Sequence, residues 1–378
     1  MNVTVNGRTR SYRSVTFDAE RNAVWLIDQR LLPHQFKLVT TTDYRQTTEA
    51  IRTMVVRGAP AIAAAAAYGL VQGARAFQGT SLRQFSHHVQ RVYEVLKGAR
   101  PTAVDPVNAM DRVLTIMRRG KTVAEQQSLA LAAAEELVHA TITQCQAIGK
   151  HGARLIHNGS RILTHCNAGW LACVDVGTAT APLYAAQSQG KRFHVFCAET
   201  RPRCQGAMLT AWELAQQGIS HQVVADTAVG LLFARGQIDL VLVGADRVVC
   251  RTGGIANKIG TYTSAVLARH HRVPFYVAVP LTTLDWKLRS ERDIPIEERD
   301  PAEVLGAWGL PIQPEARRPT PKAIEPVYVR VANPTSQALN PAFDVTPPGL
   351  ITGFITPQGI FKPGELRGQR TRLLLESS

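Results

Sequence analysis

Five short apolar segments decide the fold of this 378-residue chain: RILTHC (161–166), FHVFCAE (193–199), HQVVAD (221–226), DLVLVGAD (239–246) and VPFYVAVP (273–280). Each is followed by a turn and by helical spacing. Continuous apolar strands imply burial on both faces, which is typical of a parallel sheet with helices on both sides. The sequence therefore predicts an α/β fold whose C-terminal domain holds a Rossmann-like, doubly wound parallel sheet.

The N-terminal part is predicted to be mainly helical, with a small β element at its start. The segment 14–28 has two apolar runs around a polar turn, which indicates a β-hairpin. Helical spacing follows over 43–53, 81–96 and 105–118. Pro60 suits the first turn of an alanine-rich helix, whose small side chains favour close packing.

We place the domain boundary near Gly120, which gives an N-terminal domain at 1–120 and a catalytic domain at 121–378. A long run over 123–156 reads as one helix that bridges the two. Residues 282–339 form an irregular insertion rich in charge and proline, with a disordered stretch expected around 316–323.

The chain carries 43 Lys and Arg residues against 29 Asp and Glu residues, a formal net charge of +14. Such an excess favours anionic partners, from nucleic acids and acidic membranes to phosphorylated metabolites. The basic residues are scattered and do not alternate with aromatic ones, so we expect no nucleic-acid partner. A pocket that binds one phosphate needs only a few cations.

Six cysteines form no CxxC pair, and the chain opens with the polar stretch MNVTVNGRTRSYRS. These features predict reduced thiols and a cytoplasmic location. The stretch 58–77 is mostly alanine and carries Tyr68 and Arg75, so we expect a buried helix and no membrane partner.

Ligands of open parallel sheets bind outside the carboxyl ends of the strands, so the residues that end each run are informative. Cys166 and Asp246 stand at two such ends. Apolar surroundings raise the pKa of a carboxyl group, which suits Asp246 as a general acid, but an N-cap or an ion pair with Arg247 is equally open. Cys166 precedes a turn that opens a helix, so it is either a base or nucleophile, or an inert packing residue.

Two further segments have the character of anion-binding turns. Residues 253–261 join two glycines to Lys258 at an expected helix start, and Arg57-Gly58-Ala59 places an arginine beside free backbone N–H groups. Neither matches a P-loop or a GxGxxG motif, so the sequence predicts no nucleotide.

Seven motifs, in order, resemble the methylthioribose-1-phosphate isomerase family: RGAPAI (57–62), ARPTAV (99–104), HCNAG (165–169), ETRPRCQGAMLTAWEL (199–214), GADR (244–247), NKIGTY (257–262) and NPAFDVTP (340–347). The family's superfamily also includes ribose-1,5-bisphosphate isomerases and regulatory subunits of the eukaryotic initiation-factor nucleotide-exchange complex. A non-catalytic subunit of that kind is the alternative from another class.

The resemblance implies an aldose–ketose isomerase of methionine salvage that converts 5-methylthioribose 1-phosphate into 5-methylthioribulose 1-phosphate. It implies no metal, no organic cofactor and a homodimer. The cysteine of HCNAG and the aspartate of GADR, here Cys166 and Asp246, are implied to be the catalytic pair. The residues implied to bind the substrate are Arg57, Gly58, Ala59, Arg100, Gln205, Asn257 and Lys258.

The implied reaction sets a specific problem, because a sugar phosphorylated on its anomeric oxygen cannot open its ring as a free hemiacetal does. We expect Asp246 to protonate the ring oxygen. Hydrogen then moves from C2 to C1, either as a proton carried by Cys166 or as a hydride, and the sequence leaves both routes open. Ala198 before ETRP and Asp105 after RPTAV depart from the family's usual residues. The group at C5 is therefore also open, and 5-deoxyribose 1-phosphate or ribose 1,5-bisphosphate are alternative substrates.

Overall fold

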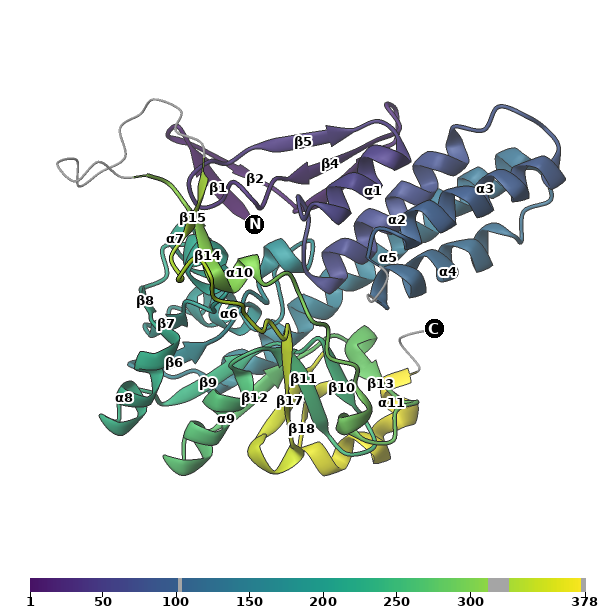
Figure 1. Cartoon of the computed structure of the whole chain (residues 1–378). Coiled ribbons are helices and arrows are strands. Elements are labelled where there is room, and N and C mark those ends of the chain that lie inside the picture. The colour runs from purple at the N-terminus through teal and green to yellow at the C-terminus, as the bar shows by residue number, and fades with distance from the viewer. Residues whose placement is uncertain (101–103, 312–325, 375–378) are drawn as a thin grey trace.

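The structure, a computed structural model, describes residues 1–100, 104–311 and 326–374 (Figure 1). The expected disordered stretch at 316–323 and the middle of the ARPTAV motif lie outside these residues. An upper body of helices with a small β element sits above a lower body built on the large sheet (Figure 1).

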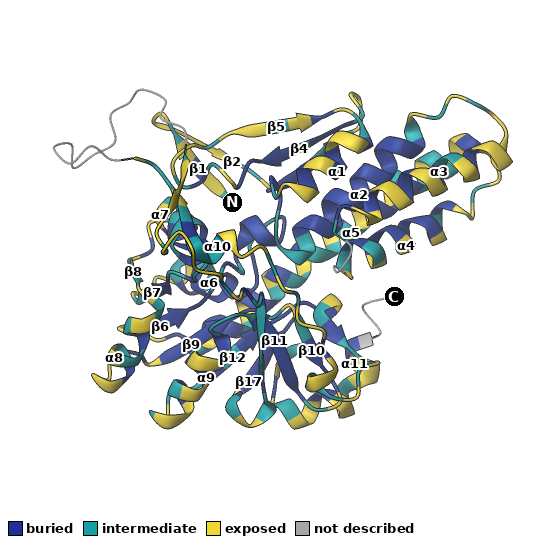
Figure 2. Ribbon diagram, in the orientation of Figure 1, coloured by how far each residue is buried: buried dark blue, intermediate teal, exposed yellow. Residues whose placement is uncertain are grey.

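Five helices form the core of the N-terminal part: α1 (Tyr44–Arg52), α2 (Ala59–Arg75), α3 (Leu82–Lys97), α4 (Asp105–Met117) and α5 (Val123–Gly152). Side-chain oxygens of Asp43, Ser81 and Thr122 accept backbone N–H groups at the starts of α1, α3 and α5, which fixes where these helices begin. Helix α2 is buried along almost its whole length (Figure 2). Its alanines allow the other four helices to pack closely around it.

The small β element precedes these helices. It consists of β1 (Asn2–Val5) paired with β2 (Arg8–Ser11), and an antiparallel sheet of β3 (Val15–Asp18), β4 (Ala23–Ile27) and β5 (Leu38–Thr41). In the turn between β3 and β4, the Asp18 carboxylate accepts the backbone N–H groups of Glu20 and Arg21, each at 3.1 Å. The predicted hairpin at 14–28 is present.

The large sheet has seven strands in the order β18-β17-β12-β9-β6-β7-β8, all parallel except β18. The strands are β6 (Arg161–Thr164), β7 (His194–Ala198), β8 (His221–Val224), β9 (Leu240–Val243), β12 (Phe275–Ala278), β17 (Gly353–Thr356) and β18 (Gly359–Phe361). The parallel strands therefore follow the doubly wound order 3-2-1-4-5-6, which reverses between β6 and β9. This confirms the predicted fold class.

The remaining helices of the sheet body are α6 (Ala181–Ser188), α7 (Ala211–Gln216), α8 (Val229–Ala234), α9 (Thr261–His270), α10 (Ala302–Leu305) and α11 (Arg370–Leu374). A four-stranded sheet of β13 (Leu284–Asp285), β10 (Arg247–Val249), β11 (Gly254–Lys258) and β16 (Phe343–Thr346) lies beside the large sheet. A hairpin of β14 (Gly306–Gly309) and β15 (Val327–Arg330) belongs to the predicted insertion.

Helix α5 joins the two bodies, since it packs against α2 and α4 at one end and against α6 and β17 at the other. The position of a domain boundary near Gly120 stays a prediction. Among the described residues, no helix is both long enough and apolar enough to cross a membrane.

We expect Phe354→Ala to lower the free energy of unfolding by about 3–5 kcal/mol, because the Phe354 ring is fully buried in the core of the large sheet. Urea denaturation followed by circular dichroism measures the loss. Ile360 on the neighbouring strand β18 is 37% exposed, so Ile360→Ala is the matched control, with an expected change below about 1 kcal/mol. Equal losses in the two variants would contradict this description of the core.

Candidate active site

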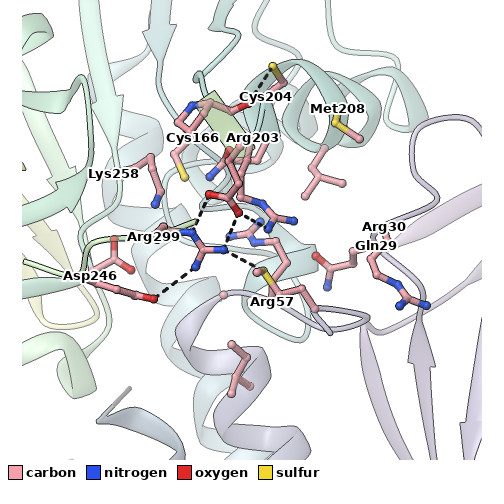
Figure 3. A pocket seen from close by; sticks show the side chains of 18 of the residues that line it. Gln29, Arg30, Arg57, Cys166, Arg203, Cys204, Met208, Asp246, Lys258 and Arg299 are labelled. Atoms are coloured by element: carbon pink, nitrogen blue, oxygen red, sulfur yellow. Dashed lines mark hydrogen bonds and ion pairs between the residues drawn. The ribbon is translucent and has the colours of Figure 1, made fainter. Parts of the chain in front are cut away.

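A cavity of about 930 Å³ lies between the helical body and the carboxyl edge of the large sheet (Figure 3). Both bodies contribute residues to its walls. The predicted site residues that line it are Arg57, Gly58, Ala59, Arg100, Cys166, Gln205, Asp246 and Lys258.

Cys166 and Asp246 meet in this cavity because of the strand order. Cys166 follows β6 and Asp246 follows β9, and these neighbouring parallel strands flank the point at which the order reverses. That reversal opens a crevice at the carboxyl edge of a doubly wound sheet. Residues 80 positions apart in the sequence therefore face one space.

The backbone around Cys166 is held in an unusual conformation. Its φ is +66°, in the left-handed region that is costly for a residue with a Cβ. The Cys166 N–H donates to the hydroxyl of Thr200 at 2.8 Å, and the hydroxyl of Thr210 donates to the Cys166 carbonyl at 2.7 Å. These two bonds stabilise the turn that directs the thiol into the cavity.

Burial raises the pKa of the Cys166 thiol, although the positive charges of Arg57 and Lys258 act in the opposite direction. Since the ordinary pKa of a thiol already lies above neutral, Cys166 stays protonated at pH 7. The site therefore holds a neutral thiol in its resting state.

The Asp246 side chain is exposed to the cavity, but the cavity itself is surrounded by protein. This enclosure raises the pKa of its carboxyl group, and the cations Lys258, Arg57 and Arg100 lower it less. The alternative of an ion pair with the next residue does not hold, because Arg247 pairs with Asp285 at 3.7 Å. A carboxyl group with a raised pKa keeps its proton to higher pH, as a general acid requires.

Arg57 is fixed by the turn that follows Cys166. Its Nη1 donates to Oδ1 of Asn167 at 2.5 Å, and its Nη2 donates to the Asn167 carbonyl at 3.0 Å. Two bonds to one residue orient the planar guanidinium group toward the cavity. The sequence identified Arg57 but not the asparagine that positions it.

Glu213 on α7 is fully buried and organises this turn from behind. Its carboxylate accepts hydrogen bonds from the Asn167 side chain at 3.0 Å, the N–H groups of Trp170 and Leu171 at 3.1 Å each, and the Tyr184 hydroxyl at 2.9 Å. Burial raises the pKa of Glu213, and these four bonds act against that shift. The residue lies within the ETRPRCQGAMLTAWEL motif. Because its neighbours Ala211, Trp212 and Leu214 are apolar, the local sequence did not indicate that it supports a site.

Glycine is required at the entry to α2. Gly58 has a φ of +90°, and a Cβ on it would overlap Ala172. The close approach brings the start of α2 to the turn after Cys166. The free N–H groups of this 17-residue helix therefore begin at the cavity wall, beside Arg57, where they favour an anion.

Lys258 ends β11 and reaches the cavity from the other side. Its Nζ donates to the Ala342 carbonyl at 2.8 Å and lies 4.4 Å from the centre of the Phe343 ring. Burial lowers the pKa of Lys258, although Cys166 and Asp246 raise it. Arg100 is a second partly buried cation, 3.9 Å from the Glu297 carboxylate.

Asn257 differs from the other predicted residues. Because side chains alternate along a strand, Ala256 and Lys258 face the cavity and Asn257 faces the opposite side of β11. Its Nδ2 donates to the Thr261 hydroxyl at 2.9 Å, at the start of α9. A contact between the Asn257 side chain and a ligand stays a prediction.

The insertion adds charged residues that the sequence did not assign to the site. Arg299 makes a two-pronged pair with Glu303, at 2.9 and 2.7 Å, and Arg203 binds the same carboxylate at 2.9 Å (Figure 3). Burial alone would raise the pKa of Glu303, but Arg299 and Arg203 lower it to about 2. Arg299 and Glu303 lie four residues apart in a charged run, and this spacing could have predicted their ion pair from the sequence.

Asp105, one of the departures from the family pattern, also lines the cavity. Burial and then the nearby Asp246 raise its pKa to about 6, against the charge of Arg247. Within the described residues, no group of three or more His, Cys, Asp or Glu side chains is placed to hold a metal ion.

The chain belongs to the Initiation factor 2 subunit family, whose model matches residues 55–363. It is 44% identical over 359 residues to a methylthioribose-1-phosphate isomerase of Methylorubrum populi, covering 93% of each chain. This relationship places the chain, within that family, among relatives that are named as isomerases.

Two solved structures have the same fold. The 5-methylthioribose 1-phosphate isomerase of Pyrococcus horikoshii OT3 gives a TM-score of 0.84 at 36% identity, over 97% of this chain and 96% of that one. The translation initiation factor eIF-2B, subunit delta, from A. fulgidus gives a TM-score of 0.81 at 36% identity, over 97% and 100%. The fold is thus shared by proteins named as an enzyme and as a translation factor.

We expect Glu213→Gln to lower the free energy of unfolding by about 1–3 kcal/mol, because its NH2 group would face N–H donors that now have an acceptor. Chemical denaturation measures the change. Glu136, an exposed residue on α5, supplies the control Glu136→Gln, for which we expect a change within about 0.5 kcal/mol. A Glu213→Gln protein as stable as its control would show that the carboxylate does not hold the turn.

Proposed function

We propose that this protein converts 5-methylthioribose 1-phosphate into 5-methylthioribulose 1-phosphate, an aldose–ketose isomerisation in methionine salvage. The observation that carries the proposal is the convergence of Cys166 and Asp246 on one cation-lined cavity at the reversal of the strand order. The isomerase names of relatives that match 93% of the chain at 44% identity support it.

The phosphate dianion is assigned to the cations around the start of α2. Arg57 offers a planar fork of donors, Lys258 a point charge, and α2 its free N–H groups. Arg100 adds a third positive charge to the same cavity. Gln205, Gly58 and Ala59 complete the proposed binding set, and a contact between Asn257 and the substrate stays a prediction.

Asp246 acts as the acid that opens the ring. Its raised pKa keeps a proton available for the ring oxygen, and protonation allows the bond between that oxygen and C1 to break. The resulting positive charge at C1 is shared with the phosphate-bearing oxygen. A hydride then moves from C2 to C1, and the proton of the 2-hydroxyl returns to the Asp246 carboxylate, which restores the acid.

The hydride route is supported by the direction of the pKa shift of Cys166. Its raised pKa leaves little thiolate to remove a proton from C2, so the neutral thiol is assigned to stabilising the transition state. The alternative route, in which Cys166 carries the hydrogen as a proton, introduces hydrogen from solvent at C1 unless the thiol returns the same proton before it exchanges.

The reaction run in D2O distinguishes these routes. We expect the product to carry no deuterium at C1, because a hydride that moves within the substrate never meets solvent. Proton NMR of the isolated ketose measures the incorporation. Deuterium at C1 from the first turnovers would overturn the hydride assignment and restore Cys166 as a base.

The group at C5 is proposed to be apolar. Met54, Ile62, Met208 and Leu209 line the cavity, and a methylthio group would remove more apolar surface from water there than a second phosphate would. The 5-phosphate of ribose 1,5-bisphosphate would place two negative charges beside such apolar side chains.

A non-catalytic role as a subunit of a translation initiation factor is the second candidate, since the A. fulgidus protein named eIF-2B, subunit delta, is 36% identical to this chain. Such a subunit has no requirement for a protonated carboxyl group and a thiol in one cavity. Turnover of a sugar phosphate by the purified protein separates the two functions.

We expect Asp246→Asn to abolish turnover and Cys166→Ser to lower kcat by roughly 100-fold or more, as acid and transition-state groups require. Purified protein is offered 5-methylthioribose, 5-deoxyribose and ribose 1-phosphates, together with ribose 1,5-bisphosphate, and ketose formation is followed by NMR. A wild-type protein that converts none of these sugars would overturn the proposed function. A fully active Asp246→Asn variant would overturn the acid assignment alone.

We also propose a cytoplasmic homodimer. All six cysteines are free thiols, which supports a reducing compartment. The dimer rests on the resemblance to the isomerase family.

A further inference from the structure

Gln29 lines the cavity from the N-terminal β element, a part of the chain that none of the resemblance motifs covers. It follows β4, and its N–H donates to the Val55 carbonyl at 3.0 Å, which ties it to the segment leading to Arg57. Its side chain points from the end of β4 toward the middle of the cavity (Figure 3). The residue is only 3% exposed.

The orientation of its carboxamide is fixed by one hydrogen bond. Nε2 of Gln29 donates to the Leu171 carbonyl at 2.9 Å. Because a carbonyl only accepts, the nitrogen must occupy this position and the oxygen must occupy the other. Leu171 is in turn held by Glu213, so the amide rests on the same buried carboxylate as Arg57.

The amide oxygen that remains has no hydrogen-bond partner among the described residues, although it is buried. Buried acceptors without a donor are rare in folded proteins, and each one calls for an explanation, one of which is a partner such as a water molecule or a ligand. Because Gln29 lines the cavity, a small movement of its side chain or of a neighbouring group would open this oxygen to a bound molecule.

The missing partner must be a donor, and a sugar hydroxyl is the donor that the substrate offers. 5-Methylthioribose 1-phosphate has two hydroxyl groups, at C2 and C3. The 2-hydroxyl loses its proton in the reaction and must lie near Asp246. The 3-hydroxyl keeps its proton throughout, so a fixed acceptor can bind it before, during and after the hydrogen transfer.

The placement of Gln29 agrees with this choice. It lies on one side of Arg57, and Asp246 and Lys258 lie on the other (Figure 3). The reacting carbons belong with Asp246, which leaves the C3 side of the sugar for Gln29. We propose that Gln29 is a further substrate-binding residue whose Oε1 accepts a hydrogen bond from the 3-hydroxyl of the sugar, an inference that rests on the isomerase function proposed above.

The contact makes Gln29 a determinant of specificity. A sugar without the 3-hydroxyl leaves a buried amide oxygen unpaired in the complex, which penalises that sugar. For the wild-type protein, we expect kcat/KM to fall roughly 10- to 100-fold when 3-deoxy-5-methylthioribose 1-phosphate replaces the natural sugar.

The variant that tests the assignment is Gln29→Met, which keeps the length of the side chain and removes its amide. We expect it to lower kcat/KM for the 3-hydroxy sugar and to leave kcat/KM for the 3-deoxy sugar within about threefold of wild type. The ratio of kcat/KM for the 3-hydroxy sugar to kcat/KM for the 3-deoxy sugar, which measures the preference for the 3-hydroxyl, then falls close to one. This preference is a ratio of two activities of one preparation, so it does not depend on the fraction of protein that is folded.

Gln72 on α2 supplies the matched control. It is a buried glutamine of the same body whose Nε2 donates to the Asn22 and Thr41 carbonyls and whose Oε1 accepts from the Thr47 hydroxyl. It lies outside the cavity wall. We expect Gln72→Met to lose stability and to keep the wild-type preference for the 3-hydroxyl.

The outcomes separate this inference from the proposed function. An unchanged preference in Gln29→Met, or a wild-type protein that uses both sugars equally, overturns the Gln29 assignment while the isomerase function stands. The second of these results needs no variant, so a Gln29→Met protein that fails to fold does not remove the test. A wild-type protein that converts neither sugar overturns both.

Discussion

The buried carboxylate of Glu213 is the interaction on which the site depends. An isolated carboxylate in a protein interior costs several kcal/mol, so it persists only when its oxygens are fully occupied by donors. Glu213 meets this condition with four hydrogen bonds, two of them from backbone N–H groups of one turn. A Cβ on Gly169 would overlap this carboxylate, so the turn approaches Glu213 as closely as a backbone can. Asn167 and Leu171 then hold Arg57 and Gln29, and one buried charge thereby orients two walls of the cavity.

Enclosure by protein makes a charged Glu213 unfavourable, and the same effect favours the protonated form of Asp246. Three cations around Asp246 favour its charged form, yet enclosure outweighs them and raises its pKa. A phosphate dianion bound by Arg57 and Lys258 would cancel much of this positive charge. The carboxyl group would then hold its proton more tightly, so binding of the substrate itself would keep Asp246 in its protonated form. The phosphate would thus contribute to the protonation state as well as to affinity.

The sequence predicted the sheet and the positions of Cys166 and Asp246 at its strand ends from local patterns, whereas their catalytic roles were implied only by the resemblance to the isomerase family. Continuous apolar strands are typical of a parallel sheet. Polar residues that end such strands lie together at one edge of the sheet, as Cys166 and Asp246 do. Glu213 gave no local signal, since its partners lie more than 25 residues away in the chain. Nothing in the sequence indicated Gln29 either, because an amide oxygen can be recognised as unpartnered only when the tertiary contacts are known. For Asn257 the sequence predicted a contact with the ligand, but membership in a motif does not say which face of a strand a side chain occupies.

The insertion contributes both Glu303 and Arg299 to the wall of the cavity. Glu303, whose pKa is held at about 2, stays ionised near neutral pH and offsets the charges of Arg299 and Arg203. These two arginines therefore attract an additional anion less strongly than their number suggests. Arg57 beside the start of α2 and Lys258 at the end of β11 act on both Cys166 and Asp246, and we assign the phosphate to these two cations. In the proposed complex, a phosphate bound at that point places C1 and C2 near Asp246 and Cys166 and directs the rest of the sugar toward Gln29.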